Sequence, residues 1–189
     1  MISRLFSGPY ALRAFIVAVL LSAALGWTVW DQVQIIRHGT EIVLKTRPVD
    51  PRSLFRGHYA RLNYDISRIA RTKISSDGKL KRRARVFVRL KPGEDGFWQV
   101  TEVSSARLTP AEGSVILNAT VRSVSRKQVW LRYGIERYFA PKQKALGLEK
   151  KFRDRKIEVG VIVRVAKYGA AAISGLQLEG KKVYDEPLF

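Results

Sequence analysis

An uncharged apolar run from Ala14 to Trp30 most constrains how this chain folds. Its 17 residues are just enough to cross a bilayer as a helix, the form in which a single segment satisfies its own backbone hydrogen bonds in lipid. Trp27 and Trp30 end the run as interfacial anchors do. We therefore expect a short cytoplasmic N-terminus over residues 1–13, a transmembrane anchor over 14–30 and a juxtamembrane connector over 31–40.

The apolar run has two other interpretations. A cleaved signal peptide would use Ala14–Ala24 as its apolar region and Ser22–Ala24 as its cleavage site, but the run continues to Trp30, which favours an anchor. A buried helix of a soluble protein would show a polar face, and none interrupts the run. Arg4 and Arg13 precede it, so the positive-inside tendency favours export of the chain that follows.

Residues 41–189 are expected to form one extracytoplasmic, strand-rich domain, since their length suits a single hydrophobic core. The chain carries a net charge of +19, and only Arg4 and Arg13 contribute before Asp31, so +17 belongs to the rest. It has no cysteine, which excludes disulfides, thiol nucleophiles and cysteine-bound zinc.

Alternation of apolar and polar residues predicts that strands dominate this domain. The strictest alternation runs from Ile157 to Val165. In 79–91, Ala84, Val86, Val88 and Leu90 share one face, and Arg83, Arg85, Arg89 and Lys91 surround Phe87 on the other. Further strands are expected over 41–45, 58–69, 97–103, 115–124, 127–138 and 171–178, with a short amphipathic helix within 141–155. The prediction is a mainly β, antiparallel barrel- or sandwich-like domain with one short helix, preceded by the transmembrane helix.

The segment from Phe55 to Tyr64 combines a turn, two aromatic residues and one of only two histidines. Gly57 can supply a positive φ. In a strand that follows it, Leu62 and Tyr64 face the core and Tyr59 lies on the opposite face. Leu62 and Tyr64 are thus a structural motif, and the candidate functional residues are Arg56, Gly57, His58 and Tyr59.

A second group of candidate functional residues is Tyr133, Gly134, Glu136 and Tyr138. Glu136 and Tyr138 would share one strand face. If this segment neighbours the first, the two would form a polar, aromatic site. A structural alternative pairs Glu136 with a nearby arginine.

The pattern Gly57-His58-Tyr59-x-x-Leu62-x-Tyr64 is similar to the motif that names the GDYXXLXY family of bacterial membrane-anchored proteins. It matches at every named position except His58, where the family has Asp. Further agreement comes from Asp50-Pro51-Arg52, Tyr133-Gly134-x-Glu136-x-Tyr138-Phe139, Leu148-Glu149, Gly169-x-Ala171-x-Ile173-x-x-Leu176 and Gly180. The resemblance implies a single-pass protein of the bacterial inner membrane and no particular activity. The histidine puts in doubt any role that needs a carboxylate at that position.

Catalytic interpretations rest on few residues. His58 with Ser53 and Asp50 or Asp65 could form a nucleophile, base and orienting acid, and a Ser-Lys hydrolase is a second enzymatic option. We assign no catalytic residue, and with two histidines and no cysteine we expect neither a metal site nor a cofactor.

The sequence favours a binding or assembly module for an envelope or membrane partner. Its expected contacts are the bilayer, through the helix, and anionic lipid headgroups or a membrane protein. One alternative is a membrane-anchored hydrolase or peptidase with a site near His58 and Tyr59. Another is a nucleic-acid-binding protein if the domain is cytoplasmic, with Phe87 stacking on a base, although an exported domain is not expected to meet nucleic acid. The basic residues could also serve solubility alone.

Overall fold

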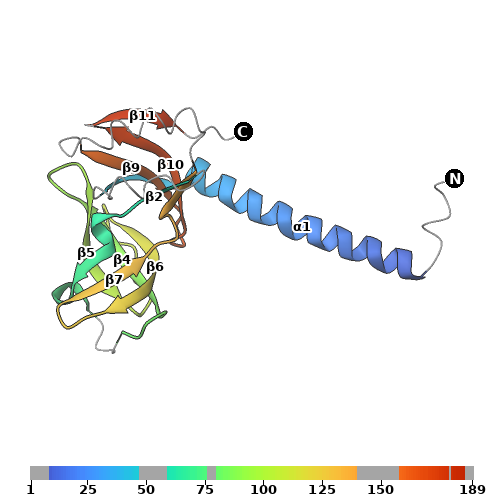
Figure 1. Cartoon of the computed structure of the whole chain (residues 1–189), viewed down its shortest axis with the longest axis horizontal. Helices are drawn as coiled ribbons and strands as arrows, with labels where there is room; N and C mark the ends of the chain where they lie inside the picture. Colours follow the sequence, from blue (N-terminus) through green and yellow to red (C-terminus); the bar gives the residue numbers. More distant parts are fainter. Residues whose placement is uncertain (1–8, 47–58, 76–79, 140–157, 179, 186–189) are drawn as a thin grey trace.

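The computed structural model describes residues 9–46, 59–75, 80–139, 158–178 and 180–185. One N-terminal helix, α1 (Pro9–His38), leads into a mainly β domain (Figure 1). The strands are β1 (Thr40–Lys45), β2 (Tyr59–Arg61), β3 (Arg68–Ala70), β4 (Arg85–Pro92), β5 (Trp98–Ser104), β6 (Val115–Val124), β7 (Gln128–Arg132), β8 (Arg137–Phe139), β9 (Val159–Val165), β10 (Ala171–Leu178) and β11 (Lys181–Asp185). Two 3₁₀ turns, η2 (Asp65–Ser67) and η3 (Arg71–Lys73), flank β3. The mainly β fold class predicted from the sequence is confirmed.

Five strands form a nearly closed barrel in the order β3-β7-β6-β4-β5, with every pairing antiparallel. The ends of this sheet meet where Ile74, just after η3, bridges to Val103 of β5 and the Ser75 N–H donates to the Val103 carbonyl at 3.0 Å. In β4, the residues Val86, Val88 and Leu90 point into the core, as their alternation predicts.

A second antiparallel sheet, in the order β1-β9-β10-β11, packs beside the barrel and shares its core. Leu44 of β1 and Val161 of β9 lie in the same buried cluster as Leu90 and Leu117 of the barrel. Ile162, on the other face of β9, is buried too, so this strand is covered on both faces. β11 is a strand that the sequence did not predict.

Two predicted strands are broken in the structure. The chain over 58–69 is not one strand: β2 ends at Arg61, Tyr64 bridges to Thr46, and η2 precedes β3. The strand predicted over 127–138 ends at Arg132, and a turn with Gly134 at φ +88° precedes β8. The helix predicted within 141–155 lies outside the described residues.

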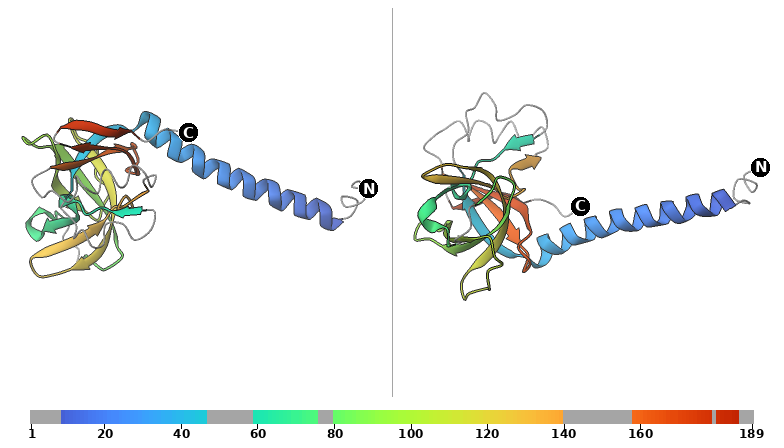
Figure 2. Two further views of the ribbon diagram at one scale, coloured as in Figure 1. Left: turned by 45° about the horizontal axis from the view of Figure 1, so that its top comes forward. Right: turned by 90° about the horizontal axis from the view of Figure 1, so that it is seen from below.

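Most of the expected connector is helical, because α1 continues through residues 31–38. These last turns of the helix pack on β9 and β10. Ile35 is only 5% exposed, and the Gly39 N–H donates to its carbonyl at 2.9 Å. A Cβ on Gly39 would lie 2.5 Å from that carbonyl oxygen, so only glycine fits this close approach. The rest of the helix projects away from the domain (Figure 2), and Leu12–His38 is long and apolar enough to cross a membrane.

Candidate functional site

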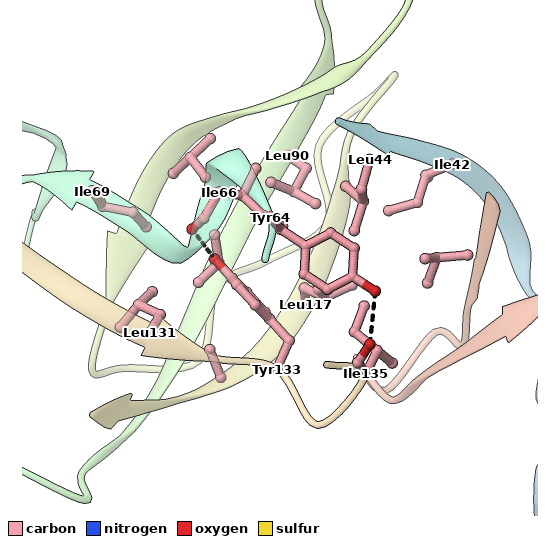
Figure 3. Close-up of a cluster of buried hydrophobic side chains, with 14 of the residues drawn as sticks. Ile42, Leu44, Tyr64, Ile66, Ile69, Leu90, Leu117, Leu131, Tyr133 and Ile135 are labelled. Atoms are coloured by element: carbon pink, nitrogen blue, oxygen red, sulfur yellow. Dashed lines mark hydrogen bonds between the residues drawn. The ribbon is translucent and has the colours of Figure 1, made fainter. Parts of the chain in front are cut away.

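Two buried tyrosines connect the two segments singled out in the sequence (Figure 3). The Tyr64 hydroxyl donates to the Ile135 carbonyl at 2.7 Å, and the Tyr133 hydroxyl donates to the Ile66 carbonyl at 2.7 Å. Each tyrosine thus reaches the backbone of the other segment. We call this reciprocal pair the tyrosine clasp.

The clasp hydroxyls are held in their protonated form. Burial raises the pKa of Tyr64 well above its usual value, and the nearby Glu136 carboxylate raises it further. Burial, and then Glu136, raise the pKa of Tyr133 in the same direction, because an ionised phenol loses its hydration in the core. Both hydroxyls therefore stay protonated and donate to backbone carbonyls.

Glu136 serves the fold of the turn that carries Tyr133. Its carboxylate accepts hydrogen bonds from the Tyr133 N–H at 2.6 Å and the Gly134 N–H at 3.0 Å, and its own carbonyl accepts from the Leu62 N–H at 2.9 Å. Glu136 therefore holds this turn through backbone amides, and its pairing with an arginine stays a prediction. Glu136 precedes β8, so it does not share a strand face with Tyr138 as predicted.

The two segments are neighbours, as a joint site would require. β2 pairs with β8 in antiparallel register, with Tyr59 opposite Phe139 and Ala60 opposite Tyr138. The side chains of Tyr59 and Tyr138 are outside the description, as are Arg56, Gly57 and His58 altogether. The structure brings the backbones together, and a role for these five residues stays a prediction. Leu62 and Tyr64 are buried, as a structural motif requires.

The residues considered for catalysis are only partly described. Asp65 lies half-buried in η2 and already has an interaction partner, whereas Asp50, Ser53 and His58 fall outside the described ranges. Within those ranges, no group of three or more His, Cys, Asp or Glu side chains could hold a metal ion.

An open groove of about 1250 Å³ is lined by residues of β3, β7, β6 and β4, and also by Tyr64 and Tyr133 of the tyrosine clasp. We call it the arginine groove, because five arginines and a single carboxylate, that of Glu136, line it among the described residues. The arginines are Arg68, Arg85, Arg122, Arg132 and Arg137. The arginines outnumber the carboxylate among the described lining residues, so that part of the groove is positively charged.

Strand register aligns two of these arginines across the groove. Arg132 of β7 lies opposite Thr120 of β6, and Thr120 lies opposite Arg85 of β4. Residues directly opposite on paired strands point to the same face, so two guanidinium groups flank one hydroxyl at about 10 Å backbone separation. In the described part of the chain, neither Arg85 nor Arg132 has a carboxylate partner. This row is suited to an anion with several acceptor oxygens.

Half-buried aromatic side chains complete the groove. The Arg68 guanidinium lies 5.9 Å from the centre of the Trp130 ring, a cation–π contact that orders both side chains. Phe87 lies opposite Asn118 on the neighbouring strand. Arg89, predicted to share this cationic surface with Phe87, instead pairs with Glu102 at 2.7 Å. The groove therefore offers flat apolar surface beside its arginines.

The sequence located parts of this groove but not the groove itself. Arg85 and Phe87 belonged to a predicted cationic strand face, and Arg132 begins the segment that contains Tyr133 and Glu136. Thr120, Arg122 and Trp130 carried no recognised signal. Alternation along their strands could have shown that these side chains point outward. It could not have shown that they lie side by side, because alternation does not give the register between strands.

Comparison with known proteins gives a family. No curated protein and no solved structure matches the chain. A family model described as GDYXXLXY protein matches residues 21–176, which include the tyrosine clasp and the arginine groove. The chain therefore belongs to the GDYXXLXY family.

Proposed function

We propose that this protein is a membrane-anchored, extracytoplasmic binding or assembly module of the bacterial inner membrane, and that the arginine groove holds its envelope or membrane partner. The observation that carries the proposal is the row formed by Arg85, Thr120 and Arg132. Arg85 and Arg132 have no carboxylate partner among the described residues and repel each other, so an anionic partner would stabilise this arrangement.

The helix supports the membrane part of the proposal. α1 is long and apolar enough to span a bilayer, and Trp27 and Trp30 are largely exposed at the end of its apolar run. Asp31–His38 then packs directly on the domain. Tethering raises the effective concentration of the groove near membrane components, and each nearby cation adds about 1 kcal/mol at an anionic leaflet.

Topology can be tested with single cysteines, because the chain has none of its own. Ser105 is exposed and lies outside the groove. In intact cells, a membrane-impermeant maleimide should label the Ser105→Cys variant without permeabilisation. Labelling only after permeabilisation would place the domain in the cytoplasm and refute the export part of the proposal.

Binding in the groove can be tested from Ser67, which lines it. A photo-crosslinker attached to the Ser67→Cys variant should capture an envelope or membrane component that the same crosslinker at Ser105→Cys does not capture. Adding Arg85→Gln and Arg132→Gln to the Ser67→Cys variant should abolish the adduct. Equal capture from both positions would show that the groove is not the binding site.

A further inference from the structure

Building on the proposed function, we infer that the arginine groove binds the phosphate of an anionic phospholipid headgroup in the leaflet next to the domain. The inference depends on where the groove lies relative to α1. A soluble phosphate compound offers the same oxygens, but it would not require the groove to lie beside the helix.

A chain of hydrogen bonds joins the groove to the membrane end of the domain. Asp31 directly follows Trp30, the last residue of the apolar run, and accepts a hydrogen bond from the Tyr168 hydroxyl at 2.7 Å. Asn118, which lines the groove, donates from its side chain to the Tyr168 carbonyl at 3.0 Å. Tyr168 therefore links Asn118 of the groove to Asp31, the first residue after the apolar run.

The turn that makes this connection is closely fitted. The Asn118 N–H donates to the Gly169 carbonyl at 2.9 Å. Gly169 has φ +90°, and a Cβ there would lie 2.5 Å from the Asn118 side-chain oxygen. Glycine is therefore required for the turn to lie against β6. In Figure 1, β6 is on the side of the barrel nearer the helix.

The arginine row lies a short distance along β6 from this connection. Thr120 is two residues beyond Asn118, which is about 7 Å along a strand. The polar headgroup layer outside each face of the hydrocarbon core is itself several ångströms thick. The proposal places a phosphate of that layer against the Arg85 and Arg132 side chains, whose guanidinium groups can each donate two hydrogen bonds to it.

The remaining groove residues suit a lipid headgroup. A phosphodiester carries one negative charge, and the two guanidinium groups that flank Thr120 can share it. Trp130 and Phe87 provide apolar surface for the glycerol region that adjoins the phosphate. The groove is open, as a ligand that remains in the bilayer requires.

The test uses the full chain in a non-ionic detergent, titrated with dihexanoylphosphatidylglycerol. The reference ligand is dihexanoylphosphatidylcholine, whose choline cancels the phosphate charge on the same acyl chains. We expect phosphatidylglycerol to bind at least about tenfold more tightly. The Arg85→Gln/Arg132→Gln variant should lose that preference, whereas the matched control Arg107→Gln/Arg126→Gln, which changes two exposed arginines outside the groove, should retain it.

Inorganic phosphate and a short single-stranded thymidylate oligonucleotide are titrated in parallel. If either binds through Arg85 and Arg132 more tightly than phosphatidylglycerol does, the lipid inference is overturned, while the proposal of a binding groove stands. If the two arginines affect no probe, or the control variant loses as much affinity as the groove variant, the inference and the groove assignment both fail. Thermal unfolding of each variant verifies folding, and the Arg132→Gln single variant replaces the double variant if the latter unfolds.

Discussion

The tyrosine clasp and the arginine groove adjoin each other, since Tyr64 and Tyr133 are among the residues that line the groove, and they satisfy their polar groups in opposite ways. Inside, the Tyr64 and Tyr133 hydroxyls each have a backbone acceptor at 2.7 Å. Outside, Arg85 and Arg132 face a shared groove with no carboxylate partner among the described residues. Complete internal satisfaction indicates a structural role, and exposed like charges indicate a surface shaped for something external.

The comparison shows that the family motif and the residues suited to binding are mostly different residues. Leu62 and Tyr64 of the motif are buried, and Tyr133 and Glu136 of the second segment hold the turn that Tyr64 contacts. A motif with several named positions can therefore specify how two segments join. The residues suited to binding lie on β4, β6 and β7, mostly outside the motif.

A first test of this difference is alkaline unfolding, which involves both clasp hydroxyls at once. Tyrosines in the unfolded chain ionise at about pH 10, whereas burial raises the pKa of Tyr64 and Tyr133 in the folded protein. The folded protein keeps protons that the unfolded chain releases, so this contribution to stability is complete below about pH 10 and is lost as the pH rises further.

Chemical denaturation across this pH range should show a steeper loss of stability for the wild type than for Tyr64→Phe/Tyr133→Phe. The double variant is expected to be less stable at neutral pH by about 1–2 kcal/mol per hydroxyl. Parallel pH profiles would mean that the clasp does not control the alkaline transition.

Truncating a clasp tyrosine should lower the free energy of unfolding far more than replacing a groove arginine. Tyr64 is 1% exposed, so Tyr64→Ala should lower the free energy of unfolding by about 3–5 kcal/mol through a cavity and a lost hydrogen bond. Arg132→Gln, on the outer face, should change it by about 0.5 kcal/mol or less. Urea titration of both variants measures the contrast, and similar losses would show that the groove arginine supports the fold.

The smallest expected effect comes from Tyr168→Phe, which removes only the hydroxyl that bonds to Asp31. Because the site is exposed, we expect a stability change of about 0.5 kcal/mol. The groove should nevertheless move relative to the bilayer. A fluorophore on Ser67→Cys, with a headgroup-attached quencher, should be quenched less in the Tyr168→Phe variant, and equal quenching would remove Tyr168 from the positioning of the groove.

The individual strands were predictable because alternation is a local property. Val86, Val88 and Leu90 face inward as their spacing indicates. The same reasoning failed over 58–69, since Leu62, Tyr64 and Ile66 keep a spacing of two while the backbone leaves the sheet for η2. Burial was thus predicted correctly there and strand continuity was not.

The groove could not be predicted, because it depends on register between strands distant in the sequence. Arg85, Thr120 and Arg132 align only when β4, β6 and β7 pair with one particular offset, and a shift of one residue would turn a strand's side chains to the other face. The tyrosine clasp could not be predicted either, because the contact between Tyr64 and Ile135 is not specified by local spacing in the sequence.

The direct continuation of α1 into the domain couples the direction of the helix to the orientation of the domain. The helix has 30 residues and is about 45 Å long, and the fitted contacts at Ile35 and Gly39 leave little slack at the pivot. Transmembrane helices adjust their tilt to bilayer thickness. In the proposed membrane-anchored arrangement, a thicker or thinner bilayer would therefore re-orient the whole domain and change the tilt of its cationic face.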